Sequence, residues 1–399
     1  MDKQEIACRV KEAVEKHART AKTLSDDLCA NPELSGQEFE SSRKMVSILK
    51  KAGYTVEYPF RGLSTAFRAI LDAGRGPKAA ILAEYDALPE VGHGCGHNLH
   101  GALSVLAALA LAELKDLING TVCVIGTPDE ETAGAKILMA EKGVFDGLDL
   151  AVMMHSCGGG GFSQANMAAL SLRGYVVEFS GQTAHAVAAP WRGRSALAAA
   201  RKFIDLIDAR RECFTPDAYV NAVISGGGSA ANVIPGRASV SLEFRAASMG
   251  NLALMDDIIS KCARGAALAM DCGVELRRSC DDFADMIRIA TLEEEIEALF
   301  QSLGLPVKSV SPPLGSTDVG NVSYRCPSVQ PLISITREDF ALHTREFAEA
   351  TLKAEAFDAM EKGAQALALL VLKTLRDEEF RKKTRDEFKA NRAAKVKSL

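Results

Sequence analysis

The segment 93–98 has the sequence His-Gly-Cys-Gly-His-Asn and brings two imidazoles and a thiol close together in the chain. The side chains of Cys95 and His97 can converge on one point only if the backbone turns sharply. Gly94 and Gly96 permit such a turn, because a residue without a Cβ adopts a positive φ at little cost. Thiolate and imidazole ligands suit zinc, manganese, iron or nickel better than calcium or magnesium. We therefore interpret the segment as part of a transition-metal site rather than as a glycine-rich turn that happens to contain histidines.

A pair of adjacent carboxylates, Glu130 and Glu131, follows an apolar segment that is typical of a buried strand. Like charges this close repel each other, so a shared site is costly unless a cation lies beside them. One carboxylate can bind a metal while its neighbour takes and returns protons. The alternative is an exposed acidic loop, because acidic clusters are usually solvated. The apolar strand before the pair and the Cys/His segment elsewhere in the chain favour a site.

Most residues that could do chemistry stand at or soon after the end of an expected strand. The expected strands are short and almost entirely apolar, at residues 66–71, 79–83, 122–125 and 150–154, as in strands buried on both faces. Asp86 and the Cys/His segment follow the second of them, the glutamate pair follows the third, and His155 follows the fourth. The carboxyl ends of the strands are the ligand-binding edge of an open α/β sheet. We therefore expect these segments to converge on one site.

Helical patterns connect the expected strands and also begin the chain. Apolar residues recur at helical spacing in residues 6–28, 39–49, 101–117 and 133–141. Alternating β and α segments predict an α/β fold, with a mostly parallel sheet covered by helices.

The pattern changes near residue 168, which predicts a second domain. Strands with more alternation are expected at residues 171–180, 219–225 and 238–244, and long helices at residues 195–210 and 251–268. This is the layout of a small α+β domain with an antiparallel sheet and helices on one face. Because the chain then resumes helix and strand patterns and contains His343, we predict an insertion. Residues 170–282 would form the inserted domain, and residues 1–169 and 283–399 the other.

Length and composition narrow the class of protein. A chain of 399 residues is too long for one compact core, which also favours two domains. The net charge of −5 gives no electrostatic case for nucleic acid or a membrane surface as a partner. The longest apolar run, residues 102–112, is too short to span a bilayer. No basic-then-apolar leader opens the chain, and ten scattered cysteines fit a reducing cytoplasm better than a disulfide framework. We therefore expect a cytoplasmic protein.

Taken together, these motifs resemble metallopeptidase family 20, the aminoacylase/carboxypeptidase type, and within it the subfamily D amidohydrolases. The matching stretches run in the family's order, at residues 31–35 (Asn-Pro-Glu-Leu-Ser), 85–89 (Tyr-Asp-Ala-Leu-Pro), 92–98, 127–131 (Thr-Pro-Asp-Glu-Glu), 181–190, 232–235 (Asn-Val-Ile-Pro), 316–318 (Ser-Thr-Asp) and 342–344 (Leu-His-Thr). Residues 95–98 and 315–323 are most similar to the branch of p-aminobenzoyl-glutamate hydrolases and β-alanyl-dipeptidases. The resemblance implies a zinc-peptidase-like catalytic domain with an inserted ferredoxin-like dimerisation or lid domain, through which a homodimer forms.

The resemblance also implies roles for single residues. It implies two divalent metal ions, manganese or zinc, with cobalt or nickel as further fits, and these ligands: Cys95, His97, Glu131, His155 and His343. Glu130 would be the general base and acid, and Asp86 would orient a ligand. His185 would reach the active site of a partner subunit and stabilise the oxyanion, unless it is only a capping or surface histidine.

Four further residues would contact the substrate: Asn232, Arg245, Ser316 and Thr317. Arg245 would hold the substrate carboxylate, although without the resemblance it could equally be the solvated end of a strand. The loop that contains Ser316 and Thr317 either shapes the substrate pocket or serves only as a turn.

The chain departs from the wider family pattern at three positions. Glu84 stands where the family's first ligand is usual, so the cysteine takes over that role. Asn98 replaces a frequent aspartate, which removes one carboxylate. Asp129 replaces a more usual alanine before the glutamate pair, and nothing in the sequence explains that choice.

The implied reaction is hydrolysis of the amide bond of small N-acyl amino acids or dipeptides, of the p-aminobenzoyl-glutamate or β-alanyl type. A water activated by the two ions would attack the carbonyl while Glu130 takes its proton. A nucleophilic Cys95 is the rival role, but a metal-bound thiolate is a poor nucleophile, and the glutamate pair would then lack a purpose. Two alternatives stay open: hydrolysis of another C–N bond, such as that of an aromatic amine, and a catalytically silent metal-binding protein of the same fold.

Overall fold

In the described part of the chain, residues 2–313 and 315–397, the computed structural model has a six-stranded sheet within the larger of two structural units. The larger unit takes in residues up to 168 together with residues 286–312 and 318–393. The smaller unit takes in residues 169–285 and two short flanking pieces. The chain thus leaves the larger unit after residue 168 and returns to it at residue 286.

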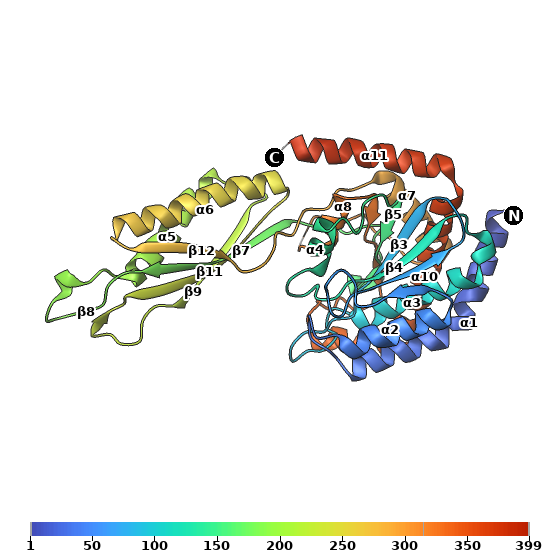
Figure 1. The fold of residues 1–399 in the computed structure, drawn as a ribbon, viewed down its shortest axis with the longest axis horizontal. Helices are drawn as coiled ribbons and strands as arrows, with labels where there is room; N and C mark the ends of the chain where they lie inside the picture. Colours follow the sequence, from blue (N-terminus) through green and yellow to red (C-terminus); the bar gives the residue numbers. More distant parts are fainter. Residues whose placement is uncertain (1, 314, 398–399) are drawn as a thin grey trace. The chain divides into compact units, whose positions relative to one another are not determined.

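The sheet of the larger unit has the strand order β1-β2-β4-β3-β5-β13, and Figure 1 labels its central strands β4, β3 and β5. Its parallel strands are neighbours: β4 (Thr121–Gly126), β3 (Lys78–Ala83), β5 (Leu150–Val152) and β13 (Ser328–Val329). The strands β1 (Thr55–Glu57) and β2 (Phe67–Asp72) are antiparallel to their neighbours. The prediction of a mostly parallel sheet is confirmed. The sequence predicts β2 as a strand buried on both faces, but its side chains alternate between buried and half-buried, as fits an antiparallel strand near an edge.

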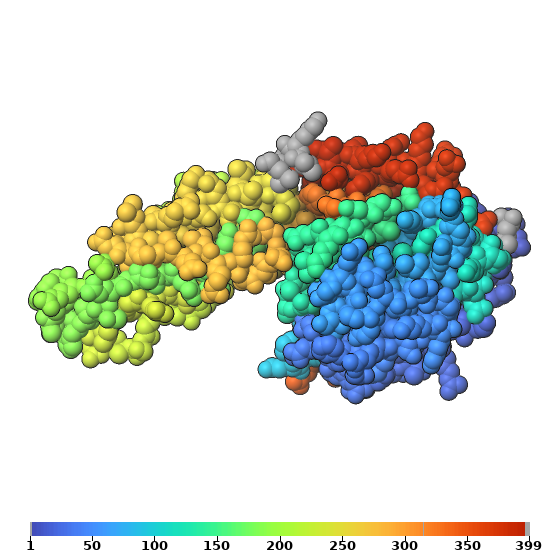
Figure 2. Space-filling model, viewed as in Figure 1, coloured from blue at the N-terminus to red at the C-terminus, as the bar shows by residue number. Residues whose placement is uncertain are grey.

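Helices cover this sheet, as predicted. The helices of the larger unit are α1 (Lys3–Ala30), α2 (Phe39–Lys51), α3 (His97–Glu113), α4 (Ala135–Glu141), α7 (Ala290–Ser302), α8 (Val319–Ser323), α9 (Arg345–Ala350) and α10 (Ala354–Arg376), followed by α11 (Glu378–Lys397). Helices α3 and α10 pack on β3, and α1 packs against both of them. Each of α1 and α2 buries one apolar stripe and exposes the opposite face, so both lie on the surface of this unit, in blue in Figure 2.

Helix α3 is apolar all round and is buried along its length. Every side chain from His97 to Leu111 is buried. Such a helix is typical of the core of a larger unit rather than of its surface. Its first residue is His97, four positions before the start that the apolar pattern predicts, because Gly96 adopts a left-handed conformation and begins the helix directly after the Cys/His segment. The consequence is that the first turn of α3 carries site residues.

The smaller unit has its own sheet and its own apolar core. Within the described residues its four strands are all antiparallel, in the order β12 (Gly273–Arg278), β7 (Ser171–Ser180), β11 (Arg237–Ala246) and β9 (Tyr219–Gly226). Helices α5 (Ala196–Arg210) and α6 (Met249–Ala269) cover one face of this sheet (Figure 1). Ser195 and Ser248 cap these helices through their side-chain oxygens, which explains where each helix begins. The predicted antiparallel sheet with helices on one face is therefore present.

Short elements complete the described fold. The strands β8 (Ala184–His185) and β10 (Val233–Ile234) pair in the smaller unit, and β6 (His155–Cys157) and β14 (Leu332–Ser334) pair in the larger unit. The strand predicted for residues 150–154 ends at Val152, and His155 instead begins β6. The 3₁₀ segments are Lys115–Leu117, Gly159–Gly161, Pro190–Arg192 and Arg211–Cys213. None of the helices in the described ranges combines the length and apolar character that a membrane crossing requires.

Candidate functional site

The chemically interesting residues of the larger unit lie at the carboxyl ends of its parallel strands. Glu84 and Asp86 follow β3, the glutamate pair follows β4, and His155 begins β6 shortly after β5. His97 occupies the first position of α3. The expected convergence of these segments is what the structure shows.

The five side chains predicted as metal ligands form a chain of close approaches. One ligand atom from each of Cys95, His97 and Glu131 lies within 4.8 Å of the other two. Cys95 Sγ lies 3.4 Å from His155 Nε2, and Glu131 Oε2 lies 3.3 Å from His343 Nε2. Four of these side chains are buried, whereas the side chain of His343 is 54% exposed and stands at the solvent side.

Glycines bring the backbone of the Cys/His segment close to its neighbours. Gly96 has a φ of 84°, and a Cβ added there would lie 2.1 Å from the Ser156 hydroxyl oxygen. A Cβ on Gly94 would lie 3.3 Å from the Cα of His343, whose backbone N–H donates to the Gly94 carbonyl at 2.8 Å. Gly101, one turn into α3, passes so close to the strand end that its Cβ would lie 2.2 Å from the Glu84 carbonyl oxygen. The glycines thus permit the close packing that places the ligands.

Hydrogen bonds fix the orientation of two imidazoles. His97 Nδ1 lies 2.8 Å from Asp86 Oδ1, so Nδ1 carries a proton and Nε2 is the nitrogen that faces the other ligand atoms. His155 Nδ1 lies 2.7 Å from the Ser156 carbonyl, which can only accept, so Nδ1 donates and the lone pair of His155 is on Nε2. Asp86 is itself held, because its Oδ2 accepts from the Ser35 hydroxyl at 2.9 Å. Both rings are therefore prepared as ligands.

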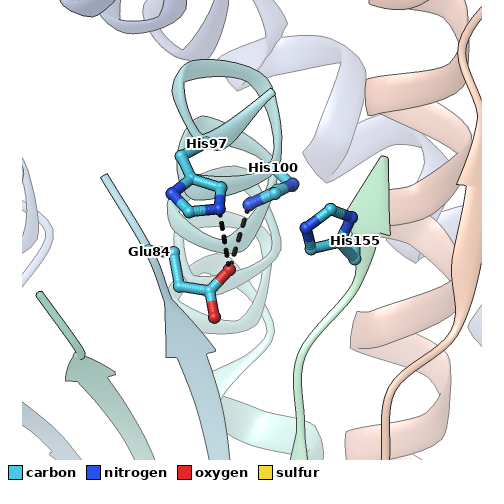
Figure 3. Close-up of side chains that lie close together, drawn as sticks. All are labelled: Glu84, His97, His100 and His155. Carbon is cyan, nitrogen blue, oxygen red and sulfur yellow. Dashed lines mark ion pairs between the residues drawn. The ribbon is translucent and has the colours of Figure 1, made fainter. Parts of the chain in front are cut away.

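A second group of ligand atoms lies deeper in the unit. It comprises Glu84, His97, His100 and His155, all buried, with one atom from each within 4.8 Å of the others (Figure 3). Sequence reasoning did not assign Glu84 or His100 to the site. The signal for His100 was its position three residues after His97 on a helix, which places both rings on one face.

Unpartnered polar atoms test whether this region suits a cation. Among the ligand atoms of these two groups, four that are buried have no hydrogen-bond partner among the described residues: Glu84 Oε2, His97 Nε2, His100 Nε2 and Glu131 Oε1. Leaving a buried polar atom unpaired costs about 1–3 kcal/mol. Four such atoms in one place, together with a thiol, imidazoles and carboxylates, fit divalent cations well.

A buried lysine lies behind the ligands. Lys136 Nζ donates to Glu84 Oε1 at 2.6 Å and to Asp318 Oδ1 at 2.7 Å, and all three side chains are fully buried. Burial raises the pKa of Glu84, but the Lys136 ammonium outweighs this and holds that pKa well below its usual range. Sequence reasoning missed Lys136, because a lysine in a short helix is normally a surface residue.

Glu130 and Cys95 are among the site residues whose pKa values are raised. Burial, and then the carboxylates of Glu84 and Asp318, raise the pKa of Glu130 well above its usual range. Burial also raises the pKa of the Cys95 thiol. A bound metal and the positive end of α3 would both favour a thiolate at Cys95. In the protein alone burial prevails, so a bound cation is the charge that would favour the thiolate.

The structure supplies a reason for Asp129. Its φ is 61°, a left-handed conformation in which aspartate is enriched. Its carboxylate accepts from the Thr132 hydroxyl and from the Ala133 N–H, and its carbonyl accepts from the Gly134 N–H at 2.7 Å. An alanine would lose the side-chain contacts. Asp129 therefore stabilises the tight turn that carries the glutamate pair.

The remaining predicted residues belong to the smaller unit or its flanking piece. His185 is exposed, and its Nδ1 accepts from the N–H groups of Val187 and Ala188 at 3.2 and 3.1 Å. The Asn232 carbonyl accepts from the Ala186 N–H, which places His185 and Asn232 near each other. Their predicted roles stay predictions.

Arg245 stands near the end of β11 in a polar group. It pairs with Glu243 at 2.8 Å, and its Nη1 lies 3.5 Å from the Ser316 hydroxyl. Thr317, next in the chain, is buried. The structure thus brings Arg245 and Ser316 together, whereas Asn232 belongs to the loop before β10.

Comparisons with known proteins show which family this chain matches and which proteins are similar to it. The model of Peptidase family M20/M25/M40 matches residues 80–373. An Xaa-Arg dipeptidase of Mus musculus is 33% identical over 402 residues, which cover 96% of this chain and 91% of that protein. A subunit of the p-aminobenzoyl-glutamate hydrolase of Escherichia coli is 31% identical over 326 residues, covering 76% of this chain and 66% of that protein.

A solved structure shows the same fold. A dinuclear metal-binding peptidase of family M20 from Bacillus subtilis aligns with a TM-score of 0.70 at 22% identity, covering 90% of this chain and 99% of that one. The resemblance deduced from the motifs is confirmed by the family match and the relatives. The protein is therefore a hydrolase of amide bonds, and the chain belongs to Peptidase family M20/M25/M40.

Proposed function

We propose that the protein hydrolyses the amide bond of small N-acyl amino acids or dipeptides with the help of two divalent metal ions. The observation that carries this proposal is the buried convergence of thiol, imidazole and carboxylate atoms next to Glu130, several of them without a hydrogen-bond partner among the described residues. The proposed ligands are Cys95, His97, Glu131, His155 and His343. When bound, such ions lower the pKa of a water molecule towards neutrality and polarise the substrate carbonyl.

Glu130 is the proposed general base and acid. It takes a proton from the attacking water and returns it to the departing amine. Its raised pKa, which burial and the carboxylates of Glu84 and Asp318 cause, suits a group that must both accept and donate near neutral pH. Asp86 supports the reaction indirectly, because it holds His97 in the tautomer that binds metal and accepts the Glu131 N–H at 3.0 Å.

The proposed substrate class combines the chemistry with the names of the relatives. One relative is named for dipeptides that end in arginine and another for p-aminobenzoyl-glutamate. In both, the amine released by amide hydrolysis is an amino acid. Arg245 is the proposed partner of the substrate carboxylate, with Asn232, Ser316 and Thr317 as further contacts. A β-alanyl dipeptide is a second substrate of this type.

A homodimer formed through the smaller unit is part of the proposal. Strand β9 is the edge of its sheet and exposes Tyr219 and Val223, by 56% and 58%. An exposed edge strand can pair with a second copy. His185 of one copy would then stabilise the oxyanion in the other, a contribution of about 3 kcal/mol for one well-placed donor. All ten cysteines are free in the structure, and we propose a reducing, cytoplasmic location.

A substrate panel tests the proposed function. The protein would be loaded with manganese, zinc, cobalt or nickel and incubated with N-acetyl and N-aromatic-acyl amino acids, p-aminobenzoyl-glutamate, and β-alanyl and ordinary dipeptides. We expect turnover of at least one class, and loss of at least about 100-fold in the Glu130→Gln variant with its metal content unchanged. No turnover with any of the four metals would contradict the proposal and would favour a silent metal-binding protein or another C–N bond.

A further inference from the structure

The carboxylate of Glu84 has one oxygen that is held and one that is not. Oε1 accepts from the buried Lys136 ammonium at 2.6 Å. Oε2 lies 3.2 Å from His100 Nε2 and 3.6 Å from His97 Nε2 (Figure 3). All of these side chains are fully or almost fully buried. Whether each ring nitrogen near Oε2 can bind a cation depends on the hydrogen bond that the other nitrogen of the same ring makes.

The backbone answers this question for His100. The Ser156 N–H donates to His100 Nδ1 at 3.2 Å. An N–H group can only donate, so Nδ1 must present a lone pair, and His100 is neutral with its proton on Nε2. That proton faces Glu84 Oε2, 3.2 Å away. His100 therefore has no lone pair to offer a metal at Nε2.

His97 and His155 differ from His100 in the role of Nδ1. In each ring Nδ1 donates, to Asp86 and to the Ser156 carbonyl, so Nε2 is the nitrogen left to bind a cation. His97 Nε2 lies 3.6 Å from Glu84 Oε2 in a buried site, and neither atom has a hydrogen-bond partner among the described residues. A buried polar atom without a partner is costly, and a cation between these atoms would remove that cost. The rings of His97 and His155 and one carboxylate oxygen thus converge, with one ligand atom from each within 4.8 Å of the others.

Lys136 keeps Glu84 ready for such a charge. Its ammonium occupies Oε1, which fixes the carboxylate plane and leaves Oε2 towards the imidazoles. Asp318 shares the same ammonium at 2.7 Å and also accepts the Lys136 backbone N–H at 3.1 Å, so the lysine cannot swing away. Glu84, at the end of β3, is in this way tied to α4 and to the start of α8.

We propose that Glu84 is an additional ligand of the cation that His97 and His155 hold, and that Lys136 and His100 are positioning residues for its carboxylate. The proposal rests on the proposed function, because it assumes that this region binds divalent cations. It assigns distinct roles to four side chains that lie equally close together: three are ligands and His100 is not. Glu84 stands where the family's first metal ligand is usual. The proposal therefore implies that residue 84 still supplies a metal ligand in this chain, in the form of a carboxylate.

Metal binding to the metal-free protein tests the assignment independently of activity. The protein would be freed of metal with a chelator and titrated calorimetrically with manganese or zinc alone, and the metal content would be counted after gel filtration. The key variant is the double substitution Glu84→Gln with Lys136→Met, which removes one negative and one positive charge of the buried Glu84–Lys136–Asp318 group together. We expect the wild type to bind two ions, and the double variant to bind one of them at least about 100-fold more weakly.

Two variants serve as matched controls. Asp318→Asn removes the other carboxylate on the same ammonium, and we expect both ions to bind within about threefold of wild type. His100→Gln keeps an N–H that can reach Glu84 but removes the imidazole. We expect this variant to bind two ions, each with an affinity within about tenfold of wild type. The absorption spectrum of the cobalt-loaded protein would report the lost carboxylate in the double variant and an unchanged ligand set in Asp318→Asn.

The outcomes separate this inference from the proposed function. If the double variant binds both ions as tightly as wild type, or if His100→Gln loses one ion, the ligand assignment is wrong while the proposed function stands. If the wild type binds no divalent ion, the proposed function itself fails. Should the double variant not fold, as judged by circular dichroism, Glu84→Asp gives the same measurement. It keeps the charge against Lys136 but withdraws the oxygen by one methylene, so weaker binding of one ion is again expected.

Discussion

At the scale of single residues, the histidines of the site are distinguished by the partner of each ring nitrogen. His97 donates to a carboxylate, His155 donates to a carbonyl, and His100 accepts from a backbone N–H. Two rings therefore leave Nε2 for a cation and the third presents a proton there, although all three are buried and close together. Such differences follow from a single hydrogen bond and are invisible in the sequence.

The first prediction concerns Asp86, which fixes the tautomer of His97. In the Asp86→Asn variant the charge that favours the Nδ1 proton is lost, so the affinity for metal should fall by about 10- to 100-fold. Calorimetric titration of the metal-free variant would measure this. Ser35→Ala, which removes only the hydroxyl contact to the same carboxylate, should have a much smaller effect. Equal affinities in Asp86→Asn and wild type would show that the tautomer is set by something else.

The second prediction concerns the stability of the metal-free protein against acid. Burial, with a further contribution from His97, lowers the pKa of His93 to about 4, below the usual value of about 6.5. Below pH 6.5 the His93 side chain binds a proton in the unfolded chain, whereas in the folded chain it stays neutral until the pH approaches 4. The stabilising contribution is therefore complete above about pH 6.5 and is lost as the pH falls towards 4, by up to about 3 kcal/mol.

Urea unfolding in the presence of a chelator, at several pH values between 4 and 7.5, would measure this effect. In the His93→Asn variant the side-chain oxygen can still accept a hydrogen bond from the Asn98 N–H, as His93 Nδ1 does at 3.2 Å. The pH dependence of its free energy of unfolding should be weaker by one proton between pH 4 and 6.5. An identical slope in variant and wild type would mean that His93 does not contribute.

At the scale of elements, the loop between α1 and α2 supports the turn that carries the glutamate pair. Glu38 is fully buried and accepts from the Asp129 N–H at 2.9 Å and from the Gly36 N–H at 2.7 Å. Its other oxygen accepts from the Thr65 hydroxyl at 2.8 Å. Hydrogen bonds to a charged acceptor are roughly twice as strong as neutral ones. A segment far from β4 in sequence thus holds the turn of the glutamate pair in place.

The third prediction follows from that contact. Glu38→Gln should weaken the hold on Asp129 and let Glu130 move, so kcat should fall by about tenfold while metal content stays the same. The matched control is Thr65→Ala, which leaves the contact to Asp129 intact and should keep most of kcat. Steady-state kinetics together with metal analysis would measure both quantities. An unchanged kcat in Glu38→Gln would show that the turn keeps its conformation without the Glu38 carboxylate.

The sequence predicts those elements whose burial leaves a clear pattern. Strand β7 has the predicted bounds. Strand β3 begins one residue earlier than predicted and β4 is one residue longer at both ends, and this close agreement follows from their uninterrupted apolar runs. Strand β12 escapes prediction, because its residues are half-buried or exposed and give no apolar run. Within the site, motifs reveal Cys95, His97 and the glutamate pair. Lys136 and Glu84 are found only by three-dimensional packing, since each charge is tolerable in the core only because the other lies beside it.

At the scale of the whole molecule, each structural unit has an apolar core of its own. The predicted metal ligands all come from the larger unit, and His185, Asn232 and Arg245 come from the smaller one. The proposed roles of these residues therefore draw on both kinds of unit, and the proposed homodimer would supply them.

The fourth prediction tests whether His185 acts on a partner subunit. His185→Ala and Glu130→Gln should each be inactive alone. After the two variants are mixed and allowed to exchange subunits, activity should return to about a quarter of wild type, the share of intact sites expected from random pairing in a twofold dimer. Sedimentation would confirm the dimer. Recovery of no activity, with mixed dimers demonstrated, would contradict a role in the partner subunit.

Helix α3, buried along its length, ties the metal site to the most protected part of the larger unit. Backbone amides in such a segment exchange with solvent only when the whole unit opens. His97 and its neighbours should therefore keep their places when metal is removed, and hydrogen exchange in the amides of α3 should hardly change. A site that is already assembled has little ordering entropy to lose on binding. Metal uptake would then be limited by the path to the ligands rather than by folding around the ion.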